Sequence, residues 1–172
     1  MLVRAALAVP VVCAAALLVT APQSQASSVR AAPARCAEKV LAVDARAVPA
    51  DPSVIRFGVT NQGTRACVVD RVPTITFGGL DGAALPVPDA GSGTYRLGAG
   101  VTAYAAVRTI VDPADPETRR TGTLTVAASA SHWGRTFTAA RLGTGRDIRV
   151  WEPVTTWWQP TAARADRAIG LG

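Results

Sequence analysis

The sequence of 172 residues predicts an all-β fold, an antiparallel sandwich or barrel, and three observations support this prediction. Short runs in which apolar and polar residues alternate recur from Ile55 to Val150. Turns rich in glycine or proline separate these runs, and many short strands with such turns are typical of sandwiches and barrels. The body of the chain shows no convincing amphipathic helix. Only residues 164–168, near the C-terminus, are expected to form a final turn or two of helix.

The clearest strand contains Ile55, Phe57 and Val59, which alternate with polar or small residues. Such a period of two buries one face of a strand and leaves the other in water. Turn residues at 61–63 then predict a hairpin whose second strand is 67–69. The other expected strands are 40–43, 75–77, 95–97, 101–107, 124–128, a segment at Phe137, 148–150, and the proline-rich 85–88, which suits a sheet edge.

Residues 1–26 have the features of a secretory signal peptide. Arg4 precedes an uncharged apolar run, 5–20, and Ser24-Gln25-Ala26 provides a small-x-small cleavage site. A membrane span needs about 20 strongly apolar residues, whereas this run is alanine-rich and contains Pro10. The pattern therefore indicates export rather than a transmembrane anchor.

We expect cleavage after Ala26, with Ala32 and Ala34 as alternative sites. Cys13 lies in the apolar run and lacks the flanking leucine and small residue of a lipoprotein signal, so we assign it to the discarded peptide. The mature protein is then expected to be secreted, or loosely associated with the cell envelope. The expected organisation is a signal peptide at 1–26, a disordered leader at 27–35, a β-sandwich domain at 36–158, and a tail at 159–172 that is disordered or forms a short helix.

The mature part of the chain contains two cysteines, Cys36 and Cys67. An even count in an exported chain indicates a disulfide. A metal site built on the same pair would need two further ligands, and the mature part offers one histidine and no methionine. We therefore expect the disulfide, with no metal and no other cofactor.

The formal net charge of the chain is +6, and all of its basic residues except Lys39 are arginine. A basic surface favours anionic neighbours such as acidic polymers or phospholipid headgroups, without specifying one of them. Apart from Arg119-Arg120, the basic residues are scattered singly along the sequence. The alternative interpretation is therefore a set of solvated arginines on exposed strand faces.

No motif for catalysis is evident. The only histidine, His132, lies in a Ser-Ala-Ser-His-Trp-Gly segment, and no Gly-x-Ser-x-Gly elbow is present. The acidic loop 112–117 contains three carboxylates but lacks the glycine turn and the alternating spacing of a calcium loop. We therefore predict that the protein is not an enzyme.

Three of the four tryptophans, Trp151, Trp157 and Trp158, lie within eight residues of one another, next to Arg149. Exposed tryptophans are good recognition anchors, so these four residues form the candidate binding site. The alternative is that the rings seal an open end of the sandwich. Adjacent residues of a strand point to opposite faces, so one of Trp157 and Trp158 could be buried and the other exposed.

From Cys36 to about Pro160, the order and spacing of several residues link the chain to a known family. The residues that carry the resemblance are Cys36, Asn61, Gly63, Cys67, Val69, Pro73, Asp81, Gly82, Leu97, Gly100, Ala103 and Ala105. On these residues, the chain resembles a family of exported actinobacterial domains catalogued only as a domain of unknown function (number 4232). The resemblance implies an Ig-like antiparallel β-sandwich with one disulfide, an extracellular or envelope location and no assigned activity. Arg71 and Gly98-Ala99 depart from the residues that the family favours.

These observations together predict an exported, non-catalytic module that binds an unknown protein or an anionic envelope polymer. We expect a monomer, with no nucleic acid as partner. The alternatives are an extracellular hydrolase and a purely structural surface protein.

Overall fold

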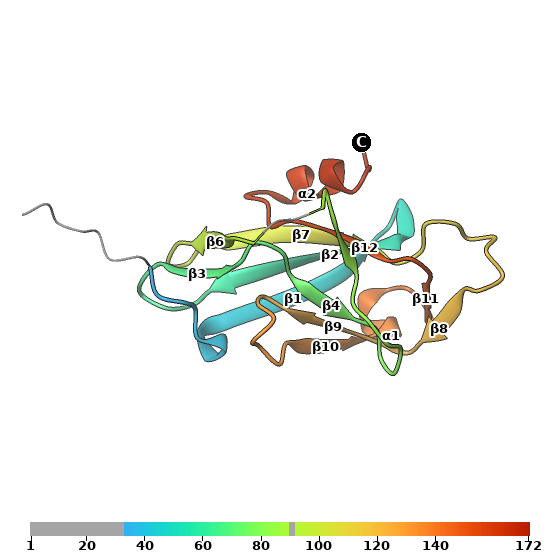
Figure 1. The fold of residues 1–172 in the computed structure, drawn as a ribbon, viewed down its shortest axis with the longest axis horizontal. Coiled ribbons are helices and arrows are strands. Elements are labelled where there is room, and N and C mark those ends of the chain that lie inside the picture. Colours follow the sequence, from blue (N-terminus) through green and yellow to red (C-terminus); the bar gives the residue numbers. More distant parts are fainter. Residues whose placement is uncertain (1–32, 90–91) are drawn as a thin grey trace, which may run out of the picture. The chain divides into compact units, whose positions relative to one another are not determined.

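The computed structural model describes residues 33–89 and 92–172, which form the unit considered below (Figure 1). The expected signal peptide and Cys13 lie outside the described residues. The unit is built of short strands arranged in several mainly antiparallel sheets, so the all-β prediction is confirmed.

The larger sheet has five strands in the order β1-β2-β7-β12-β5. All neighbours are antiparallel except β12 and β5, which run parallel. The proline-containing strand β5 lies at an edge of this sheet, as predicted, because a proline cannot donate a ladder hydrogen bond. The strands are β1 (Leu41–Val48), β2 (Asp51–Asn61), β5 (Leu85–Val87), β7 (Thr102–Arg108) and β12 (Val154–Thr156).

A second sheet has three strands in the order β10-β9-β4, and two further pairs are β11 with β8 and β3 with β6. These strands are β3 (Cys67–Asp70), β4 (Thr74–Thr76), β6 (Thr94–Leu97), β8 (Arg119–Thr121), β9 (Thr123–Ala127), β10 (Arg135–Thr138) and β11 (Ile148–Val150). The helical elements are η1 (Glu38–Val40), α1 (Ala139–Leu142) and α2 (Ala162–Ala168).

The predicted hairpin between 55–59 and 67–69 is wrong. Strand β2 is hydrogen-bonded to β1 on one side and to β7 on the other, so neither of its edges is free for β3. After the turn at 61–63 the chain leaves this sheet, and β3 pairs with β6 instead. Strand β1, which is longer than the sequence suggested, occupies the position beside β2 that we had expected β3 to fill.

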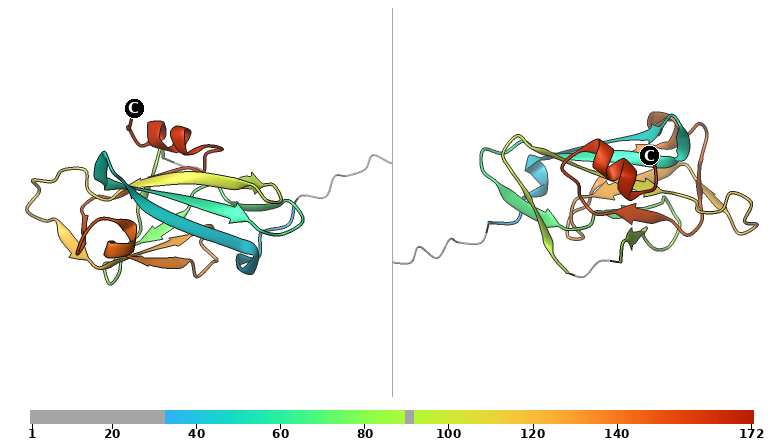
Figure 2. Two further views of the ribbon diagram at one scale, coloured as in Figure 1. Left: turned by 180° about the vertical axis from the view of Figure 1, so that it is seen from behind. Right: turned by 90° about the horizontal axis from the view of Figure 1, so that it is seen from above.

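The main core lies between the five-stranded and three-stranded sheets (Figure 1). Alternate residues of β2, namely Ile55, Phe57 and Val59, are fully buried in it, as the period of two predicted. A smaller cluster covers the opposite face of the larger sheet, where Ala165 and Ile169 pack against β2 and β7. Helix α2 therefore lies on the outer face of the larger sheet (Figures 1 and 2).

The predicted disulfide joins Cys36 to Cys67 and attaches the segment before η1 to β3. The attachment is reinforced by the backbone, because the Cys36 N–H donates to the Val68 carbonyl at 2.9 Å. Arg35 also forms an ion pair with Asp70 at the end of β3. Partial burial raises the pKa of Asp70, but its hydrogen bonds from Arg35 and a backbone N–H more than offset this, so the pKa lies below its ordinary value.

Removal of the disulfide should destabilise the fold strongly. The cross-link closes a loop with a sequence separation of 31 residues, for which the chain-entropy estimate is a stabilisation of about 3–4 kcal/mol. We expect the Cys36→Ser/Cys67→Ser variant, or the reduced protein, to melt about 10 °C or more below the oxidised protein. Calorimetry of the two forms measures this difference, and equal melting temperatures would contradict the stabilising role of the cross-link.

Candidate functional site

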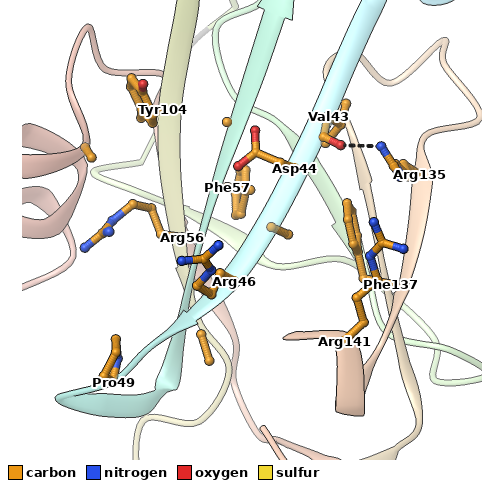
Figure 3. Close-up of a pocket in the computed structure, with 14 residues that line it drawn as sticks. Val43, Asp44, Arg46, Pro49, Arg56, Phe57, Tyr104, Arg135, Phe137 and Arg141 are labelled. Atoms are coloured by element: carbon orange, nitrogen blue, oxygen red, sulfur yellow. Dashed lines mark hydrogen bonds between the residues drawn. The ribbon is translucent and has the colours of Figure 1, made fainter. Parts of the chain in front are cut away.

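A cavity of about 530 Å³ lies along the edge strand β1, and it is lined by the outer face of the larger sheet on one side of this strand and by β10 and α1 on the other (Figure 3). We call it the arginine groove, because four arginines line it and Asp44 is its single carboxylate. The four arginines are Arg46 on β1, Arg56 on β2, Arg135 on β10 and Arg141 on α1.

The alternation of β1 places its two charged residues on the outer face of the larger sheet. Val43 and Ala47 are buried toward the core, whereas Asp44 and Arg46 are exposed. Arg46 is the direct cross-strand partner of Arg56, and like charges in this position repel each other. The sheet register thus brings together two positive charges that lie ten positions apart in the sequence.

Only one charge of this pair is balanced by the protein. Asp166 of α2 accepts two hydrogen bonds from Arg56, at 2.8 Å from Nε and 2.6 Å from Nη2. Arg46 has no ion pair with a described residue. The unpaired guanidinium of Arg46 therefore faces the groove with a like charge beside it and solvent around it (Figure 3).

On the other side of β1, the groove is lined by Arg135 and Arg141 (Figure 3). Arg135 donates a hydrogen bond of 2.9 Å to the Val43 carbonyl, and its guanidinium lies 5.4 Å from the centre of the Phe137 ring. These contacts fix the position of the guanidinium without neutralising its charge. Arg141 is exposed and, like Arg135, has no ion pair with a described residue.

Gly58 is the residue without a side chain in the β2 part of the lining. A Cβ atom at Gly58 would lie 2.9 Å from Oδ1 of Asp44 and 3.2 Å from Cγ2 of Thr102, so a larger residue would displace the Asp44 side chain. The bare backbone between these residues leaves space above the sheet, next to Tyr104. The groove is thus a shallow, basic depression with an aromatic side chain at its margin, suited to an anionic ligand.

The candidate site predicted from the tryptophans is divided among different parts of the fold. Trp158 is 3% exposed and packs edge-on against Phe57, with 5.8 Å between ring centres. Its side chain belongs to the main core, which excludes contact with a ligand at the surface. We therefore remove Trp158 from the candidate binding residues and assign it to packing, the alternative that the sequence left open.

The remaining members of that set do not converge either. Trp157 is half-buried under the guanidinium of Arg71, which lies 4.6 Å from the ring centre, and its Nε1 donates to the Pro88 carbonyl at 3.0 Å. Trp151 lines one cavity of about 360 Å³, and Arg149 lines a different cavity of about 310 Å³. Arg149 also donates a hydrogen bond to the Pro113 carbonyl.

The sequence analysis overlooked Trp133, which is 92% exposed in the turn between β9 and β10. Its turn is held firmly, since the Glu38 carboxylate accepts hydrogen bonds from the backbone N–H groups of Trp133 and Gly134, at 3.1 and 2.6 Å. The Asp70 carboxylate accepts another from Ala130 at 2.9 Å. In the sequence, Trp133 is marked only by its position beside a glycine in a polar turn. This position does not show whether the side chain is exposed.

His132 and the acidic loop have structural partners in the fold. Nε2 of His132 lies 3.1 Å from the Cys36 carbonyl oxygen, so this ring links the turn to the disulfide. Asp112 and Asp115 each accept a hydrogen bond from the backbone N–H two residues later, which closes tight local turns. No group of three or more side chains suited to hold a metal ion occurs among the described residues.

An all-β domain with one disulfide and a basic groove is thus the class of protein that the structure defines. A family model described as "Domain of unknown function (DUF4232)" matches residues 36–158, and the chain belongs to this family. No curated protein and no solved structure shows a significant match to the chain. Within the described residues, no helix has the length and apolar character needed to cross a membrane.

The contrast between two tryptophans provides a test of these assignments. Trp158→Ala should reduce the free energy of unfolding by about 3–5 kcal/mol, because it removes a large ring from the core. Trp133→Ala should change it by less than about 0.5 kcal/mol, because the ring is in water. Urea unfolding of both variants measures the two effects, and similar losses would show that one of the placements is incorrect.

Proposed function

We propose that the protein is an exported, non-catalytic β domain that binds an anionic component of the cell envelope in the arginine groove. The observation that carries this proposal is the cross-strand pair of Arg46 and Arg56, with two more arginines lining the groove on the other side of β1. An anion bound there would relieve the repulsion between like charges, which the protein itself balances only at Arg56.

Export is supported by two independent features. The pattern of 1–26, with a basic start, an apolar middle and a small-residue cleavage site, is that of a signal peptide. The Cys36–Cys67 disulfide is of the kind that persists in an oxidising compartment outside the cytosol.

The form of the groove favours an extended polymer over a small anion. Its lining includes consecutive residues of β1, from Val43 to Ala47, together with residues of five other elements. The arginines are therefore spread along and across the groove rather than gathered around one point. Arginine also suits carboxylate and phosphate groups, because its planar guanidinium donates two parallel hydrogen bonds.

Export can be tested on the native protein. We expect the protein recovered from the culture medium or the envelope fraction to begin at Ser27 and to contain no free thiol. Mass spectrometry of the intact protein, before and after alkylation, measures both properties. Recovery of the full-length chain with free Cys36 and Cys67 from the cytosol would overturn this part of the proposal.

Binding can be tested with polymers of defined charge. We expect immobilised protein to bind polyglutamate or a glycerol-phosphate polymer, but not neutral dextran, with an affinity that falls as salt is raised. The Arg46→Ala/Arg141→Ala variant should bind the anionic polymers at least about tenfold more weakly. Both side chains are exposed, so the fold should be retained.

The matched control removes the same charge elsewhere. Arg65 and Arg96 are exposed, do not line the groove and have no ion pair with a described residue. The Arg65→Ala/Arg96→Ala variant should keep its affinity within about twofold. Equal losses in the two variants would mean that net charge, rather than the groove, attracts the polymer.

A further inference from the structure

We propose that a second cavity, between the turn at 80–83 and the segment 150–153, binds a carbohydrate. The cavity has a volume of about 360 Å³, close to the lower limit for ligand sites, which suits one or two sugar rings. It shares no lining residue with the arginine groove, so this inference is independent of the function proposed above.

Half of the residues that line the cavity have large apolar side chains. Phe77 and Val150, both buried in the main core, lie at its base. Leu80, Trp151 and Pro153 are half-buried and line its sides. A half-exposed tryptophan over an apolar base offers a flat surface of the kind on which the C–H face of a sugar ring packs.

The rim carries three charged side chains that the fold does not use. Asp81, Arg119 and Glu152 are exposed at the cavity and form no ion pair or hydrogen bond with a described residue through their side chains. Five other carboxylates of the domain do have such roles: Asp51, Asp70, Asp147 and Asp166 pair with arginines, and Glu38 holds the Trp133 turn. Asp44, Asp89 and Glu117 also lack such partners, but none of them lines this cavity. The charged groups of this rim therefore remain available to a ligand.

The backbone is held in place at one of these groups, Glu152. Glu152 adopts a positive φ of 45°, the only such value among the described residues other than glycine. Its neighbours are held on both sides, because the Trp151 N–H donates to the Thr109 carbonyl at 2.9 Å and the Pro153 carbonyl accepts from the Leu85 N–H at 2.9 Å. The backbone from which the Glu152 side chain projects is therefore positioned at the rim before a ligand binds.

The mixture of polar groups distinguishes a sugar from a simple ion. Asp81 and Glu152 can only accept hydrogen bonds when ionised, whereas Arg119 and the indole N–H of Trp151 can only donate them. A hydroxyl group both donates and accepts, so several adjacent hydroxyls can satisfy all four. A simple cation would leave Arg119 without a partner, and a simple anion would leave the two carboxylates without one.

The test uses sugars of defined structure and the indole N–H signals of the tryptophans. We expect at least one of the methyl glycosides of glucose, galactose, arabinose and N-acetylglucosamine, or one of their disaccharides, to shift the Trp151 signal saturably below about 50 mM. The signals of Trp133, Trp157 and Trp158 should stay in place. Choline, arginine and inorganic phosphate serve as the cationic and anionic probes and should leave the Trp151 signal unchanged.

Variants locate the interaction within the cavity. Asp81→Asn and Glu152→Gln keep the shape of an exposed side chain and should weaken the binding of that sugar about tenfold, with an unchanged melting temperature. Trp151→Ala should abolish binding, and Trp133→Ala, which alters an exposed tryptophan outside the cavity, should have no effect.

Three outcomes would overturn the proposal. One is the absence of a saturable shift with every sugar of the panel. Another is a response to choline, arginine or phosphate but not to a sugar, which would assign the cavity to an ion. The third is sugar binding that survives Asp81→Asn and Glu152→Gln unchanged, which would place the sugar elsewhere on the domain.

Discussion

The two-sided pairing of β2 is the constraint on which the rest of the structure depends. This strand is hydrogen-bonded to β1 and β7, and its two faces are covered by the main core and by α2. With both edges of β2 occupied, β3 has to pair elsewhere, and β1 becomes the edge of the larger sheet. The register of β1 on β2 then places Arg46 opposite Arg56, which creates the charge pattern of the arginine groove. Since an edge strand has no neighbour on one side, the groove can open there.

The disulfide and its surroundings organise a different end of the domain. Cys36 is bonded to β3, its carbonyl contacts His132, and nearby Glu38 holds the backbone around Trp133. A segment that would otherwise be a loose leader thereby supports an exposed tryptophan on a rigid turn.

The two cavities lie outside this region and use different chemistry: one concentrates positive charge, and the other combines a tryptophan with groups of both signs. A small domain of this kind can carry more than one binding surface, because its exposed turns and edge strand are independent of the core.

Local patterns predicted the strands well and their partners poorly. The alternation of Ile55, Phe57 and Val59 identified β2 and its buried face, because this information lies in the strand itself. The pairing of β2 with 67–69 was predicted wrongly, because the turn at 61–63 is compatible with a hairpin but cannot reveal that another strand already occupies that edge. The candidate binding site was also inferred from closeness in the sequence, which does not show closeness in space. Trp151, Trp157 and Trp158 are close in sequence, yet one lines a cavity, one lies beneath Arg71 and one is in the core.

The sequence by itself determined the all-β class, the position of the main strands, the Cys36–Cys67 pairing and the membership of its family. These properties follow from period, composition, motif spacing and the single pairing that is possible once Cys13 is assigned to the signal peptide. The tertiary structure alone decided which side chains meet, since cavities, cross-strand pairs and exposure depend on contacts between distant segments. Arg46 and Arg141 line one groove although 95 positions separate them, and Trp133 is exposed while Trp158 is buried. The charged and aromatic residues can be read from the sequence, but only folding brings them next to the residues with which they can form a site.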